Sequence, residues 1–125
     1  MILLYTSYFA NIKKLPNSLI PVSISIKSPQ GYNGLEYKKL APMYKTLSDW
    51  KVNHDVEKYT IEYEKTVLNE LNPNEVLKEL KRIAGTNDVD RIVLVCYEKS
   101  DNFCHRHLVS KWFSENGIVT EEYVI

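Results

Sequence analysis

A short apolar strand that passes directly into a helix is the feature that most constrains this chain. Residues 92–95 are apolar, mainly β-branched and bounded by charges, as expected of a strand buried on both faces of a sheet. Leu108 and Trp112 then recur at helical spacing. Cys96 is therefore expected to end the strand and Cys104 to open the helix, at the strand end where α/β proteins place their chemistry.

The rest of the chain alternates strand-like and helix-like segments without a linker or an internal repeat. Further strands are expected at 2–5, 22–26 and 118–124, and helices after Asp55 and between the cap Asn72 and the stop Gly85. Glycines and prolines between 27 and 42 predict a long irregular loop. The pattern predicts one domain over residues 1–125, a small three-layer, Rossmann-like α/β fold. Its sheet should have about four mostly parallel strands, with those near 2–5, 22–26 and 92–96 adjacent, and 118–124 at an edge.

The composition of the chain argues against nucleic acid and membranes as its partners. Sixteen basic and sixteen acidic residues cancel in a chain of 125, so no overall field favours nucleic acid or anionic lipid. No run approaches the ~20 apolar residues of a membrane span, and the first residues do not resemble a signal peptide. We expect a cytoplasmic protein without a membrane contact, in a reducing setting where its two cysteines stay free unless they act.

The two cysteines have alternative interpretations. Cys104 lies beside a helix N-terminus and near Arg106, which favours a nucleophilic thiolate; the alternative is a small buried hydrophobe. Cys96 is ordinary core material unless it approaches Cys104, in which case the two form a redox pair or bind zinc together with His105 or His107. Their spacing does not match structural zinc sites, so we expect neither a metal nor a cofactor.

Three polar residues complete the candidate site. Glu98 follows the strand and is expected to act as a general acid or base, or else to hold Arg106 in an ion pair. Arg106 is expected to bind an anionic ligand at the helix start, where backbone N–H groups favour anions. His105 and His107 point to different sides of the helix, so at most one faces the cleft, and we assign His105 to ligand binding.

These residues also carry a family resemblance. The segments VLVCYE and FCHRHLVSKWF, with Cys-x-Glu at 96–98 and Cys-His-Arg at 104–106, resemble domain-of-unknown-function family 488, whose members are uncharacterised bacterial and phage proteins. ILLYTSYF, PVSISIKSP and the Leu-Ala-Pro at 40–42 are similar to its other recurring blocks. The resemblance implies that the polar blocks form the site, and it supplies no reaction.

Two classes of function follow. The first is an enzyme acting on a small anionic or nucleotide-like ligand, in a cleft roofed by the loop at 27–42. The second is a noncatalytic interaction module, in which the same residues form a buried network and the tyrosine-rich surface contacts a protein partner or a second copy of the chain. A basic and aromatic patch could also stack on nucleic-acid bases, and its alternative is a solvated loop face; its residues are Tyr32, Tyr37, Lys38 and Lys39.

Overall fold

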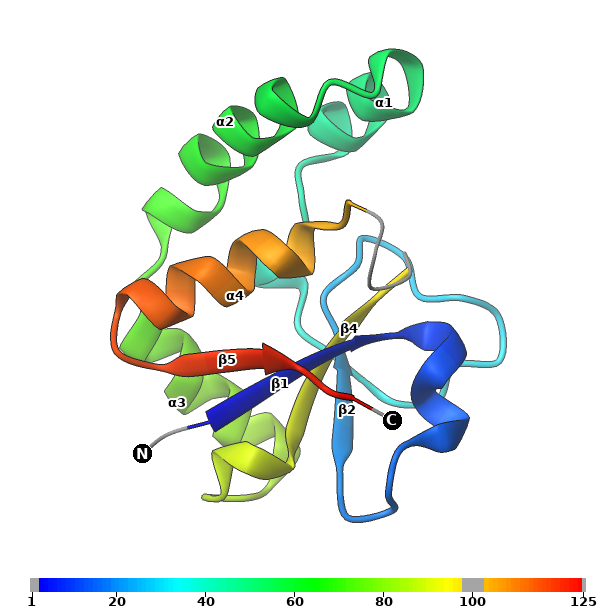
Figure 1. Cartoon of the computed structure of the whole chain (residues 1–125), viewed down its shortest axis with the longest axis vertical. Coiled ribbons are helices and arrows are strands. Elements are labelled where there is room, and N and C mark those ends of the chain that lie inside the picture. The colour runs from blue at the N-terminus through cyan, green and yellow to red at the C-terminus, as the bar shows by residue number, and fades with distance from the viewer. Residues whose placement is uncertain (1–2, 98–102, 125) are drawn as a thin grey trace.

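The computed structural model describes residues 3–97 and 103–124, which form an α/β fold around a parallel five-stranded sheet (Figure 1). The sheet has the order β3-β2-β4-β1-β5. Its strands are β1 (Leu3–Tyr8), β2 (Ile20–Ser23), β3 (Leu35–Glu36), β4 (Ile92–Cys96) and β5 (Val119–Glu122). The helices are α1 (Tyr44–Asn53), α2 (Val56–Thr66), α3 (Pro73–Ala84) and α4 (His105–Glu115), and the 3-10 segments are η1 (Phe9–Lys14), η2 (Lys38–Leu40), η3 (Leu68–Glu70) and η4 (Val89–Arg91).

The predicted parallel sheet is confirmed. β4 lies between β1 and β2 and is parallel to both, so the three strands predicted to be adjacent lie side by side in the order β2-β4-β1. β5 pairs with β1 at the sheet edge, as predicted for the strand at 118–124. The strand count is five rather than about four because the loop expected to be irregular contains β3, a two-residue strand paired with the end of β2.

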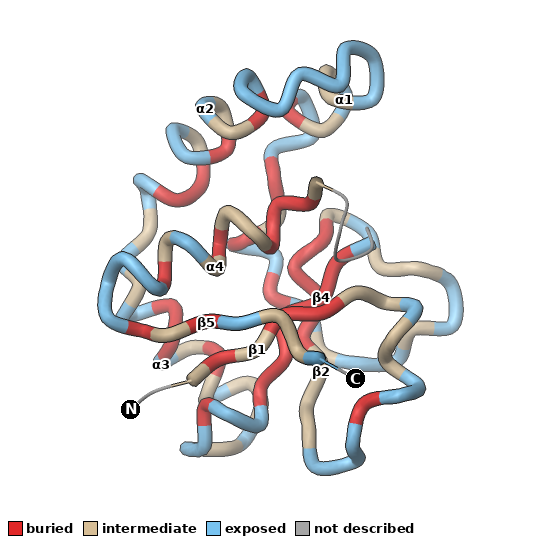
Figure 2. The backbone as a smooth tube through the Cα atoms, viewed as in Figure 1, coloured by how far each residue is buried: buried red, intermediate tan, exposed pale blue. Residues whose placement is uncertain are grey.

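The two faces of the sheet are covered differently. Along β4, Ile92, Leu94 and Cys96 face the large core formed with α2, α3 and α4. Val93 and Val95 face a smaller core on the other side, closed by side chains of η1 rather than by an α-helix. Figure 2 shows the buried residues concentrated on the central strands and on the sides of the helices that face them. Cys96 therefore points to the helical side of the sheet, toward the start of α4.

The helix starts predicted from capping residues are confirmed. Asp55 Oδ1 accepts a hydrogen bond from the Lys58 N–H (3.1 Å), and the Asn72 side chain caps α3 in the same way. Gly85 ends α3 at a positive φ of 68°. α1, in contrast, was not predicted, because the stretch shows no clear apolar stripe and its cap, Met43, offers no side-chain acceptor. Within the described part of the chain, no helix has the length and apolar character needed to cross a membrane.

Candidate functional site

A cavity of about 670 Å³ opens at the carboxyl ends of β2 and β4. The chain leaves β2 toward β3 and leaves β4 toward β5, in opposite directions along the sheet. Ligands of open α/β sheets bind in the crevice that such a reversal creates, and ligand pockets typically measure ~300–1,000 Å³. The cavity is lined by Ser25, Ile26, Lys27, Pro42, Tyr44, Leu47, Trp50, Lys51, His54, Tyr59, Cys96, Tyr97, Phe103, Cys104 and His105. Three of the five predicted site residues thus meet in its wall: Cys96, Cys104 and His105.

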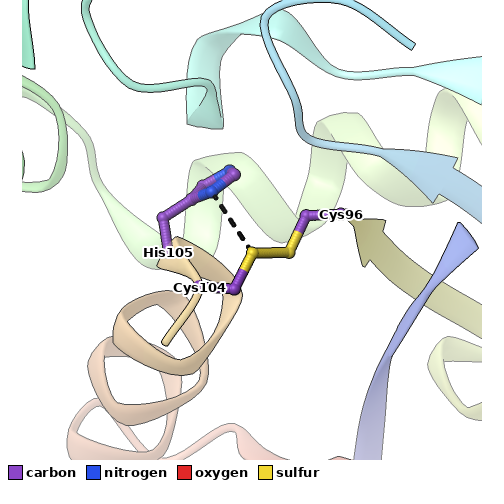
Figure 3. Close-up of side chains that lie close together, drawn as sticks. All are labelled: Cys96, Cys104 and His105. Carbon is purple, nitrogen blue, oxygen red and sulfur yellow. Dashed lines mark hydrogen bonds between the residues drawn. A yellow bond between two sulfur atoms is a disulfide. The ribbon is translucent and has the colours of Figure 1, made fainter. Parts of the chain in front are cut away.

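The two cysteines come together because β4 ends where α4 begins. Cys96 is the last residue of β4, and Cys104 is the N-cap of α4 with an extended backbone. Their sulfur atoms are joined in a disulfide, with the Cα atoms 7.2 Å apart (Figure 3). Cys96 is fully buried, whereas Cys104 keeps 7% of its surface exposed. Of the alternatives open at the sequence level, the structure thus shows the bonded pair.

His105, the first residue of α4, is oriented by the chain next to it. Its Nε2 donates to the carbonyl oxygen of Ile24 at 2.6 Å, so in the neutral ring Nδ1 carries the lone pair. That Nδ1 lies 3.9 Å from Cys104 Sγ (Figure 3). The pKa of His105 is lowered to about 4, mainly by burial. The Ile24 hydrogen bond opposes this shift, and the charges of Arg106 and His107 contribute to it. His105 is therefore a neutral base held beside a cysteine sulfur.

Arg106 lies behind the cavity wall rather than in it. Its side chain is fully buried, and its guanidinium donates to both carboxylate oxygens of Glu122, from Nε to Oε1 at 3.0 Å and from Nη2 to Oε2 at 2.8 Å. Nη1 donates to Cys96 Sγ at 3.1 Å, and the group lies over the Tyr8 ring, 5.6 Å from its centroid. The ligand-binding role expected of Arg106 stays a prediction. Glu122 already accepts from Nε and Nη2, the two donors that would bind an anion. Glu98, its partner by sequence, lies outside the described residues.

Glu122 is thus a site residue that the sequence reasoning missed. The sequence placed it only within the edge strand expected at 118–124, whereas its carboxylate also accepts a hydrogen bond from Thr6 Oγ1 at 2.7 Å. β5 carries it next to β1, and α4 carries Arg106 over the same place. The pair of acidic residues, Glu121 and Glu122, in the terminal strand was the only signal in the sequence.

Aromatic side chains from α1, from α2 and from Phe103, just before α4, form a wall of the cavity. The rings of Trp50 and Phe103 lie 4.9 Å apart, those of Tyr59 and Phe103 5.0 Å, and those of Trp50 and Tyr59 5.9 Å. Trp50 comes from α1 and Tyr59 from α2. Their place at a cavity follows from the unpredicted α1, so periodicity could not reveal it.

The polar lining is cationic and includes an unpaired hydroxyl. Lys27 and Lys51 both line the cavity with exposed side chains, and no described lining residue carries a carboxylate. Ser25 is 5% exposed, and its Oγ has no hydrogen-bond partner among the described residues. Tyr97 donates its hydroxyl to the Lys27 carbonyl oxygen at 2.6 Å, which fixes the rim. The cavity therefore suits an anionic group and offers one buried polar atom to a ligand.

Cys96, Cys104 and His105 are also a potential set of metal ligands. Their two sulfurs and one ring nitrogen lie within 4.8 Å of one another. Sulfur and imidazole ligands are those of zinc, and three protein ligands would leave a fourth position open to the cavity. Only thiolates bind a metal in this way, so the disulfide has to be reduced first. The expectation that the site holds no metal stays a prediction.

The basic and aromatic patch near the loop is engaged in internal contacts. Lys38 Nζ donates to the carbonyl oxygens of Ser25, at 3.3 Å, and of Ile26. The Tyr37 hydroxyl donates to Glu79 at 2.7 Å, and Lys39 forms an ion pair with the same carboxylate at 3.0 Å. These contacts hold the loop against α3 and against the chain that follows β2, so stacking on nucleic acid by this patch gains no support from the geometry.

Comparison with known proteins bears on the family. No curated protein and no solved structure matches the chain. One family model matches residues 14–117, a span that includes β2, β4, α4 and both cysteines. This match agrees with the resemblance carried by the Cys-x-Glu and Cys-His-Arg blocks. The chain belongs to the DUF488-N3a family, described as the active DUF488-N3 subclade.

Proposed function

We propose that this protein is an enzyme acting on a small nucleotide-like ligand in the cavity at the ends of β2 and β4. The observation that carries the proposal is the lining itself: an aromatic wall, two lysines and the cysteine pair share one concave space. The planar base would lie against Trp50 and Phe103, and its anionic group would lie near Lys27 and Lys51.

The chemistry that we assign to the site depends on Cys104. In the reduced protein the Cys104 thiol would donate a hydrogen bond to His105 Nδ1, 3.9 Å away. The thiolate, formed by loss of the proton to solvent, would be stabilised by the start of α4. The thiolate then acts as the nucleophile or orients the ligand, and Glu98 acts as the general acid or base. Arg106 holds Cys96 and Glu122, and direct binding of an anion by Arg106 remains part of the proposal.

A second candidate function is a noncatalytic interaction module. The observation that favours it is the burial of Arg106 in a network with Glu122 and Cys96, which a purely structural role would also require. The description of the family as active supports the enzyme instead. The two candidates differ in whether the cavity binds a ligand.

Calorimetric titration tests whether the cavity binds a nucleotide-like ligand. The compounds titrated are adenosine, guanosine, cytidine and uridine, and the monophosphate of each. Trp50→Ala should weaken binding of every one of these compounds by on the order of tenfold or more, the contribution of one stacked base. Trp112→Ala is the control, because Trp112 lies on α4 outside the described cavity lining.

A second pair of variants tests the anionic group. Lys51→Ala should weaken binding of the monophosphates and leave the nucleosides unchanged, because only the phosphate meets the lysine charge. Lys45→Ala on the same helix should change neither, since Lys45 pairs with Asp49 at 3.0 Å outside the cavity lining. If none of the nucleosides or monophosphates binds, the interaction module replaces the enzyme.

A further inference from the structure

We propose that Cys96 and Cys104 form a reversible dithiol–disulfide couple that exchanges electrons with an external dithiol entering through the cavity. Cys104 is the sulfur that the incoming thiolate attacks, and Cys96 is the sulfur that leaves. The inference depends on the bonded cysteine pair and its surroundings. It does not depend on the identity of the ligand proposed above. It adds a thiol–disulfide exchange activity to the site.

The difference in solvent exposure between the two cysteines indicates which sulfur an incoming thiolate attacks. Both cysteines line the cavity, but Cys104 retains 7% exposure at the N-cap of α4, whereas Cys96 is fully buried at the end of β4. Thiol–disulfide exchange requires direct contact between the incoming thiolate and the attacked sulfur. The first encounter therefore takes place at Cys104.

The leaving thiolate is stabilised from the opposite side. Arg106 Nη1 donates to Cys96 Sγ at 3.1 Å, and the guanidinium stays charged at every accessible pH. Glu122 holds Nε and Nη2, which fixes the plane of the group and directs Nη1 at the sulfur. A thiol of lower pKa leaves faster in exchange. Arg106 is thus a positioning residue for the buried sulfur, a role that agrees with its complete burial.

The exchange balances in two steps. A thiolate of the external dithiol attacks Cys104 Sγ, a mixed disulfide forms, the bond between Cys96 and Cys104 breaks, and its electron pair leaves on Cys96 Sγ. The second thiolate of the same reagent then attacks the reagent's first sulfur, which is bonded to Cys104 in the mixed disulfide. Cys104 is released as a thiolate. The reagent becomes a disulfide and the protein a dithiol, with two electrons transferred. The released Cys104 thiolate takes its proton from water, and the thiol then donates a hydrogen bond to the lone pair of His105 Nδ1 beside it.

Single-cysteine variants test the assignment of the two sulfurs. Cys96→Ser leaves Cys104 free and keeps an acceptor for Arg106, and Cys104→Ser leaves Cys96 free and places a favourable N-cap residue on α4. With an aromatic disulfide reagent, Cys104 should react faster than Cys96 by on the order of tenfold or more. Equal rates, or a faster Cys96, overturn the assignment.

The leaving-group role has its own readout. In folded Cys104→Ser protein, ultraviolet absorbance of the thiolate should give Cys96 a pKa below the ~8.5 of an ordinary thiol, despite complete burial, because of Arg106. Burial alone would raise the pKa, so a value at or above ~8.5 overturns the role of Arg106. This measurement avoids an Arg106 variant, which could fail to fold.

Reversibility is tested on the unaltered protein. After equilibration in mixtures of reduced and oxidised dithiothreitol, alkylation and mass measurement should show zero or two free thiols, changing together over one transition. Two free thiols at every mixture overturn the couple. Stoichiometric zinc that prevents oxidation of the reduced protein overturns it in favour of a metal site at Cys96, Cys104 and His105.

Discussion

At the scale of single residues, His105 should make the stability of the protein depend on pH. Its pKa falls from 6.5 in the unfolded chain to about 4 in the folded protein, mainly through burial. Between these values the unfolded state binds a proton that the folded state does not, so the free energy of unfolding is fully present above pH ~6.5 and falls toward pH ~4. The loss should approach about 3 kcal/mol, measured by urea unfolding across this range.

A matched pair of variants isolates the His105 contribution. Gln in place of His105 keeps a donor for the Ile24 carbonyl oxygen and cannot titrate, so His105→Gln should remove most of the pH dependence in this window. His54→Asn should leave the dependence intact, because Asn tolerates the left-handed backbone of His54, whose φ is 52°. An unchanged slope in the His105 variant would show that other groups titrate instead.

The Arg106–Glu122 pair is the second residue-scale test. Arg106→Lys keeps the charge but loses the two-point contact with Glu122, and Arg106 is fully buried, so we expect a loss of about 2–3 kcal/mol in the free energy of unfolding. A cycle with Glu122→Gln should show a coupling of about 1–3 kcal/mol. Lys45→Ala, which breaks an exposed pair, should cost at most about 0.5 kcal/mol. Normal stability of Arg106→Lys together with lost ligand affinity would instead support the anion-binding role.

At the scale of elements, removing the N-caps of α2 and α3 in turn tests which of these two helices ligand binding in the cavity depends on. Asp55→Ala and Asn72→Ala remove the caps of α2 and α3, and each should lower the free energy of unfolding by about 1 kcal/mol. Only Asp55→Ala should also weaken binding of adenosine monophosphate, because α2 carries Tyr59 into the cavity wall. Equal effects of both variants on affinity would mean that general stability, and not α2, governs binding.

The elements that the sequence predicted are those whose signals are local. The starts of α2 and α3 are determined by Asp55 and Asn72, and β4 by its continuous apolar run, all within a few residues of the element itself. α1 has no such signal, and β3 exists only because β2 supplies its hydrogen-bond partners. The cysteine, histidine and arginine blocks could be located for the same reason, whereas the aromatic wall depends on the placement of α1.

At the scale of the whole molecule, topology joins residues that no spacing rule connects. Glu122 meets Arg106 and Thr6 because β5 pairs with β1 while α4 packs over both strands. The sequence predicted a parallel sheet and an edge position for β5, but the order of the strands decides which side chains face one another. The partner of Arg106 was therefore beyond local reasoning, although the strand end that carries the cysteines was not.

The same topology predicts where a ligand should protect the backbone from hydrogen exchange. Adenosine monophosphate should slow exchange at residues 24–27 and in α1, which surround the cavity at the carboxyl ends of β2 and β4. A second concave surface, lined by Lys78, Lys81 and Arg82 near the end of α3, serves as an internal control because its charge would also attract a phosphate. It lies before β4 in the chain, at the amino ends of the strands, where α/β sheets do not bind ligands. Protection at the end of α3 with none near Trp50 would move the ligand away from the cysteines and leave them without a role in its chemistry.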